Sequence, residues 1–123
     1  NMMMACMYAG LAFSNTQTAI AHAISYYITA HKGVPHGVAC SFTLPMLIDN
    51  IVGKYDFIDS ALIEIFDRLE SAKLRRLYAD LGISTEFKSY GVNDQNLIGL
   101  IESLKGNKRV DNSLINLEEL VLK

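Results

Sequence analysis

Three histidines are the residues of this chain whose type and spacing could support chemistry. His22, His31 and His36 lie within fifteen residues of one another. An imidazole on an otherwise apolar helix needs partners for two ring nitrogens, and these can be a polar group of the core, a metal ion, or water at an exposed edge. The histidines therefore indicate either a metal site or hydrogen-bonded core residues, and their spacing alone leaves both possibilities open.

His22 and His36 are the better candidates for metal ligands. His22 has small alanine neighbours that leave space beside its ring, and His36 stands between a proline and a glycine where a new helix is expected to begin. Zinc and iron sites normally have three or four protein ligands. Asp49 is the only carboxylate in residues 1–52, and it lies too far along the helix from His36 to bind the same ion. Further ligands are expected from other helices or from another chain.

Composition excludes several classes of function. The chain has 123 residues, half of them hydrophobic and a fifth charged, which predicts one globular domain. A net charge of -2 gives no basic surface for nucleic acid. The apolar stretch at residues 2–13 is shorter than the roughly 20 residues of a membrane-spanning helix and lacks the basic start of a secretory signal. We therefore expect neither nucleic acid nor membrane as a partner, and a cytoplasmic location.

The opening stretch and the two cysteines are both expected to be covered. A helix that is apolar all round belongs inside a larger protein, so residues 2–13 predict a covered helix and a missing segment before residue 1. Cys6 and Cys40 are interpreted as buried thiols, because free cysteine commonly behaves as a small hydrophobic residue. A disulfide or a reactive thiol is the alternative.

The elements that must position the histidines are all predicted to be helices. Residues 1–52 contain only two charged side chains, Lys32 and Asp49, and form the expected metal-binding half, whereas residues 53–123 form covering helices. The apolar periodicity predicts helices at 2–12, 16–31, 36–52, 56–68, 70–81, 94–104 and 114–121, with connectors at 83–92 and 105–112. Gly82 is expected to end one helix, and Asn93 or Asp94 to cap the next. The predicted fold is a single all-α helical bundle over residues 1–123.

The segment AGLAFSNTQTAIAHAISYYITAHKGVPHGVACSFTLP, residues 9–45, closely resembles the signature of iron-containing (group III) alcohol dehydrogenases. In that signature a histidine on a helix is followed fourteen residues later by a second histidine in Pro-His-Gly, and His22 and His36 fit this spacing. The Ala-Phe-Ser-Asn of residues 12–15 and the Leu-Pro of residues 44–45 also match. Beyond about residue 50, only the number and rhythm of the helices agree with the all-helical, dehydroquinate synthase-like C-terminal domain of that family.

The resemblance implies a two-domain enzyme with an N-terminal NAD(P)-binding α/β domain and a helical domain that holds a divalent metal through one Asp and three His. His22 and His36 match two of these ligands, and the other two are implied to precede residue 1. Iron(II), zinc or nickel would suit such a set. No glycine-rich phosphate loop occurs in the chain, so we expect that it does not bind NAD(P) by itself. Without that domain, no residue is assigned a catalytic role.

Two aromatic residues match positions that line the substrate and nicotinamide pocket in the family. They are Phe13 and Tyr26, and both can equally be interpreted as packing residues. Many members have a histidine where this chain has Tyr26. With an ordinary pKa of about 10, a tyrosine is a weaker proton relay than imidazole near neutral pH. His31 matches no ligand and is expected to be exposed beside Lys32.

Two functions from different classes follow. The first is part of a metal-dependent dehydrogenase, in which the metal polarises the oxygen of a small alcohol or aldehyde while hydride moves to or from the nicotinamide. The second is a non-catalytic helical module for self-association or partner binding, since an exposed apolar surface usually finds a partner. We expect a homo-oligomer or an association with the missing N-terminal domain. If two chains joined their His22 and His36, four imidazoles could bind zinc or nickel without catalysis.

Overall fold

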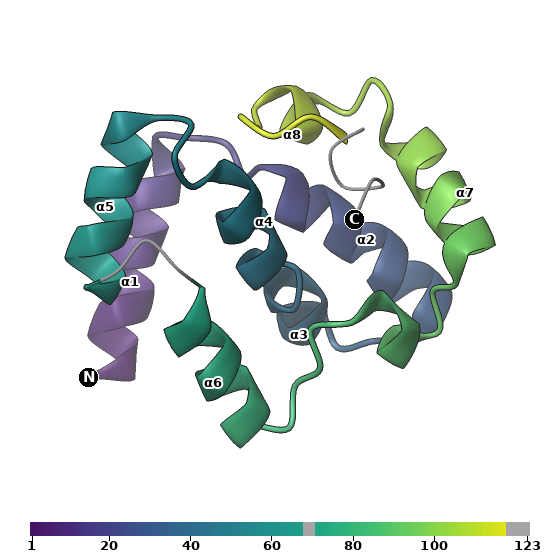
Figure 1. Ribbon diagram of the computed structural model, residues 1–123, viewed down its shortest axis with the longest axis horizontal. Coiled ribbons are helices and arrows are strands. Elements are labelled where there is room, and N and C mark those ends of the chain that lie inside the picture. The colour runs from purple at the N-terminus through teal and green to yellow at the C-terminus, as the bar shows by residue number, and fades with distance from the viewer. Residues whose placement is uncertain (68–70, 118–123) are drawn as a thin grey trace.

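The computed structural model of the chain describes residues 1–67 and 71–117, and within these ranges every regular element is a helix. In order they are α1 (Met2–Ser14), α2 (Ile20–Lys32), α3 (His36–Ser41), α4 (Leu44–Ile51), α5 (Asp56–Phe66), α6 (Ala72–Asp80), the 3₁₀ helix η1 (Phe87–Tyr90), α7 (Asp94–Leu104) and α8 (Lys108–Asp111). The predicted all-α fold is confirmed. Helix α2 runs through the middle of the molecule, and α3, α7 and α8 contact it (Figure 1).

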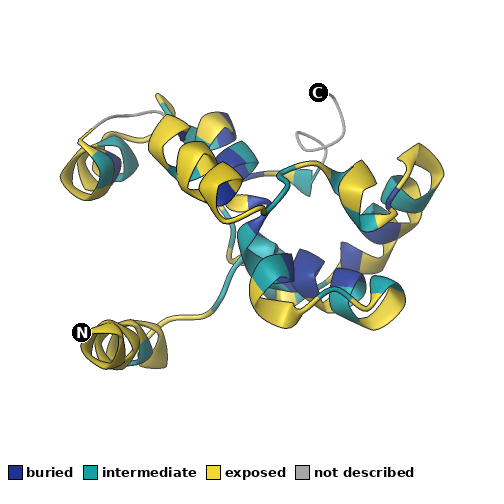
Figure 2. Cartoon of the chain, turned by 90° about the horizontal axis from the view of Figure 1, so that it is seen from below, coloured by how far each residue is buried: buried dark blue, intermediate teal, exposed yellow. Residues whose placement is uncertain are grey.

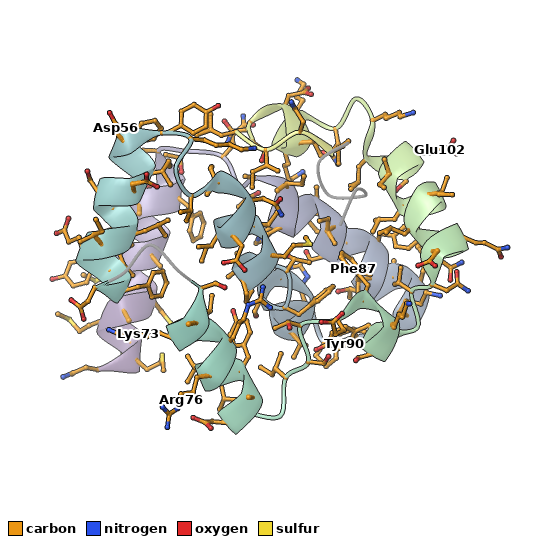
Figure 3. The ribbon with its side chains drawn as sticks, in the orientation of Figure 1. Asp56, Lys73, Arg76, Phe87, Tyr90 and Glu102 are labelled. Carbon is orange, nitrogen blue, oxygen red and sulfur yellow. The ribbon has the colours of Figure 1, made fainter. Side chains whose placement is uncertain are left out.

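The hydrophobic core forms around one face of α2. Ile20, Ile24 and Ile28 recur every four residues, so they lie on the same side of the helix, and each is at most 2% exposed. Phe42, directly after α3, is fully buried against them in the same cluster. The η1 turn closes this core with two aromatic rings, as Figure 3 shows: Phe87 and Tyr90 lie with their centroids 5.1 and 4.6 Å from that of Phe42, and α7 adds Leu100 and Leu104. Residues 1–52 thus supply most of the core, but only from α2 onward.

A sharp corner between α2 and α3 follows from the local sequence. Gly33 ends α2 with a φ of 66°, in the left-handed region that glycine adopts without steric cost. Pro35, at the N-cap of α3, has a φ of -52°, which suits the residue before a helix. The short connection turns the chain back on itself, so that α3 packs against α2. The first residue of α3, His36, therefore faces the helix that carries His22.

The helix predicted over residues 36–52 is two helices. It is interrupted at Phe42 and Thr43, because Pro45 in the first turn of α4 has no N–H to donate and its ring opposes continuation of the preceding helix. After the break, α4 presents Asp49 to α6, where the carboxylate accepts a hydrogen bond from Arg75 at 2.6 Å. Partial burial alone would raise the pKa of Asp49, but hydrogen bonds from Arg75 and Ser71 and the Arg75 charge lower it overall. Asp49 is thus engaged away from the histidines.

Several other boundaries differ from the prediction. Helix α2 begins at Ile20 instead of residue 16, because Ala19 is extended, and residues 105–112 contain α8, whose first turn is capped by the Asn107 side chain. The predicted connector 83–92 contains η1. Residues 114–117 form no α-helix, and the rest of the predicted helix 114–121 lies outside the described residues. Gly82, with a φ of 70° directly after the C-cap of α6, and Asn93, the N-cap of α7, act as expected.

Helix α1 stands apart from the helices that hold the buried residues, at the end of an extended segment (Figure 2). None of its residues is buried. Within this chain the helix is uncovered, because no other described helix packs along it closely enough to bury a side chain; its cover by another part of a larger protein stays a prediction. For the same reason the predicted buried thiol of Cys6 is exposed, while Cys40 is half-buried. No helix in the described ranges has the length and apolarity needed to cross a membrane.

Candidate metal centre

The structure brings His22 and His36 together. His22 lies in the first turn of α2 and His36 is the first residue of α3, and the corner between the two helices places their ring centroids 5.4 Å apart with the planes nearly perpendicular. Each ring leaves its helix on the side that faces the other. The two side chains can therefore approach one ion without a change in the backbone.

Cys40 is the third member of this cluster. Its Sγ lies 3.5 Å from Nε2 of His36 and 3.8 Å from Nδ1 of His22. One potential ligand atom from each of the three residues lies within 4.8 Å of the others. Cys40 was not predicted as a site residue, because its thiol was interpreted as part of the core. Cys40 follows His36 by four residues, and this spacing predicts that both side chains lie on one face of a helix.

The cluster is open to solvent on one side. His36 is exposed, whereas His22 and Cys40 are half-buried. The pKa of His22 is lowered, first by its partial burial and then by the nearby charges of His36 and Arg109. A neutral imidazole keeps the lone pair that a metal needs. The environment of His22 thus favours the form of the ring that can act as a ligand.

Tyr26 and Arg109 form the wall beside the cluster. The Tyr26 ring centroid lies 6.0 Å from that of His22 and 5.7 Å from that of His36, and the Arg109 guanidinium carbon lies 5.2 Å from the Tyr26 centroid. Arg109 also donates a hydrogen bond from Nε to Oγ1 of Thr18 at 3.0 Å. Arg109 was not predictable from the sequence, because it comes from a short helix in an expected connector, 91 residues beyond Thr18.

A polar hollow adjoins this wall, between the start of α2 and α8. It has a volume of about 430 Å³ and is lined by Thr16, Gln17, Thr18, Lys108 and Arg109. Two of these residues are cations and none is a carboxylate. The hollow is therefore suited to an anionic group that contacts Arg109, the residue that also lies over the Tyr26 ring.

The structure does not bring the remaining candidates to the cluster. Phe13 is on α1 with 59% of its surface exposed, and its ring takes part in none of the ring contacts made by Tyr26, His22 or His36. His31 is exposed, as expected, and lies against Tyr27 with the ring centroids 4.5 Å apart. Only one of the two predicted pocket residues, Tyr26, lies at the site.

The fold and the site agree with a known class of protein. Residues 1–104 match the Fe-containing alcohol dehydrogenase family, C-terminal, and the chain belongs to this family. Sulfoacetaldehyde reductase of Bilophila wadsworthia (strain 3_1_6) is a relative, 31% identical over 126 residues that cover 91% of this chain and 33% of that protein. The chain thus spans about a third of the length of this relative. No solved structure matches the chain significantly.

Proposed function

We propose that this chain is the metal-binding helical part of an NAD(P)-dependent alcohol dehydrogenase or aldehyde reductase, in which His22 and His36 are two of the metal ligands. The observation that supports this most is the convergence of the two rings across the α2–α3 corner, 5.4 Å apart, from positions fourteen residues apart in sequence. Family membership supports the reaction class.

The residues present fit a divalent metal such as Fe²⁺, Zn²⁺ or Ni²⁺, which imidazole binds well. Such an ion, when bound, supplies the Lewis acidity that polarises a carbonyl or hydroxyl oxygen. The buried face of α2 fixes the rotation of the helix and with it the direction of His22, while Tyr26 limits access to the cluster from one side. The other metal ligands and the NAD(P) site are assigned to polypeptide outside these 123 residues, which alone are expected to be inactive.

A zinc titration of the chain, followed by calorimetry under reducing conditions, tests the assignment. His36→Ala is expected to lower the affinity at least tenfold, because even groups that only orient a metal ligand are worth about 10–100-fold. His31→Ala is the matched control, since His31 is also exposed and lies outside the cluster. Circular dichroism should show unchanged helix content for both variants.

Equal zinc affinity of the His36 and His31 variants would overturn the ligand assignment. A second measurement addresses the reaction: the chain is combined with an NAD(P)-binding domain of the family that carries the other ligands, and aldehyde-dependent NAD(P)H oxidation is followed. Activity that needs both parts and is lost in His36→Ala would support the enzyme. Activity retained in that variant would contradict it.

For the substrate class, we propose an aldehyde or alcohol that carries an anionic group. The cationic hollow of Lys108 and Arg109 adjoins Tyr26 through Arg109, whose charge also acts on His22. We therefore expect a short substrate to place its anion in the hollow and its reacting oxygen at the cluster. The name of the relative supports the same class, because a sulfonate is an anion at neutral pH. Arg109 can offer two parallel N–H donors to a sulfonate or carboxylate.

Arg109→Gln tests this substrate class in the reconstituted enzyme. Loss of a charged hydrogen bond worth about 1.5–3 kcal/mol should raise KM for sulfoacetaldehyde by one to two orders of magnitude, with little change for an uncharged aldehyde of similar size. Lys105→Gln, which removes a cation outside the hollow, is the control. Equal effects of Arg109→Gln on both aldehydes would contradict the proposal.

A second candidate function, self-association without catalysis, is favoured by α1. Its apolar residues are open to solvent, with Met3 86% and Met2 79% exposed. We propose that a second copy of this chain is the partner that covers them. Helix α1 has no charged residues, so two copies of it meet without repulsion between like charges. The exposed faces of the two α1 helices, one from each chain, would pack on each other through flexible methionine side chains.

A further inference from the structure

We propose that Cys40 is a third metal ligand, so that His22, His36 and Cys40 together form a site of two imidazoles and one thiolate for a thiophilic divalent cation such as Zn²⁺. This inference rests on the proposed role of the two histidines and adds a ligand to them. Neither the resemblance nor the sequence spacing assigned Cys40 to the site.

The two sulfur–nitrogen distances of the cluster match those of a tetrahedral site. With metal–sulfur bonds of about 2.3 Å and metal–nitrogen bonds of about 2.0–2.1 Å, tetrahedral angles place sulfur and nitrogen about 3.6 Å apart. The sulfur of Cys40 lies 3.5 Å from Nε2 of His36 and 3.8 Å from Nδ1 of His22. The ligand nitrogens of His22 and His36 lie within 4.8 Å of each other, against about 3.4 Å in a tetrahedral site, so rotation of the exposed His36 side chain is needed to complete the geometry.

Hydrogen bonding explains these contacts less completely than a metal does. A neutral thiol has one proton and is a weak donor, so it can donate to only one of the two imidazoles. The second short contact then needs the other ring to donate to a sulfur that is a weak acceptor. A metal ion would satisfy the sulfur and both nitrogens together, and the thiol proton would leave to solvent when the metal–sulfur bond forms.

The scaffold holds this arrangement in place. Helix α3 supplies His36 and Cys40 one turn apart, while α2 supplies His22 from the other side of the corner. Ala39 and Phe42, both fully buried, fix the rotation of α3 against α2. The thiolate shifts the preference of the site from Mg²⁺ or Mn²⁺ toward Zn²⁺ and Co²⁺.

Cobalt(II) titration of the reduced chain tests the inference, because cobalt reports sulfur ligation directly. The unmodified chain should develop the near-ultraviolet sulfur-to-cobalt charge-transfer absorption at one equivalent. Cys40→Ser and Cys40→Ala should lose this absorption and bind at least tenfold more weakly, by the scale of about 10–100-fold for metal-site groups. Cys6→Ser is the matched control, because Cys6 is exposed on α1 and outside the cluster. Zinc should also slow alkylation of Cys40 but not of Cys6.

The outcomes separate this inference from the proposed function. Binding that depends on His36 but is unchanged in Cys40→Ala, without a sulfur band, would overturn the Cys40 assignment and leave the two histidine ligands standing. Absence of binding by the unmodified chain, with helix content intact by circular dichroism, would overturn both. A sulfur band that survives in Cys40→Ala and disappears in Cys6→Ser would also overturn the assignment.

Discussion

Helices α1 and α2 are both 13 residues long and both lack acidic residues in the first turn, yet their surroundings are opposite. In α1 no residue is buried, whereas α2 buries Ile20, Ala23, Ile24, Ser25 and Ile28 along one face. The difference is in the partners: α2 is contacted by α3, α7 and α8, and α1 lies apart from them (Figure 2). Burial of apolar side chains stabilises a helix, but a helix buries them only where neighbouring helices pack against it.

The largest effect is expected on the α2 side of this comparison. Phe42→Ala should lower the free energy of unfolding by about 3–5 kcal/mol, since Phe42 is fully buried and its ring packs on Phe87 and Tyr90. Because Phe42 also fixes α3, zinc affinity should fall in the same variant. Urea unfolding followed by circular dichroism measures the stability. A loss below 1 kcal/mol would mean that this core is not the one that holds the fold.

The smallest effect on stability is expected for α1. The double substitution Met3→Gln and Leu11→Gln should change the free energy of unfolding of the monomer by less than about 0.5 kcal/mol, because both side chains are exposed. In sedimentation velocity the unmodified chain should behave as a dimer at micromolar concentration and the double variant as a monomer. A monomeric unmodified chain would contradict self-association through α1 and leave the enzyme proposal unaffected.

The candidate site differs from α1 in the same way. The α2–α3 corner holds His22, His36 and Cys40 on helices that each bury residues in the core, so the site is on the packed side of the molecule. Phe13, the candidate that α1 was expected to bring, is exposed and apart from the cluster's ring contacts. A residue on an unpacked helix cannot line a pocket until something holds that helix in place.

The sequence by itself determined the helical class, because apolar residues spaced at 3.6-residue intervals and residues at helix ends such as Gly82 and Asn93 act locally. It also indicated His22 and His36 as a candidate pair, through the residues around them and the match to the family signature. The tertiary structure decided the rest. The rotation of α3 against α2 brings Cys40 to the two histidines, and the packing of α8 on α2 brings Arg109 to Tyr26. Both depend on contacts between residues distant in sequence, which local periodicity does not encode.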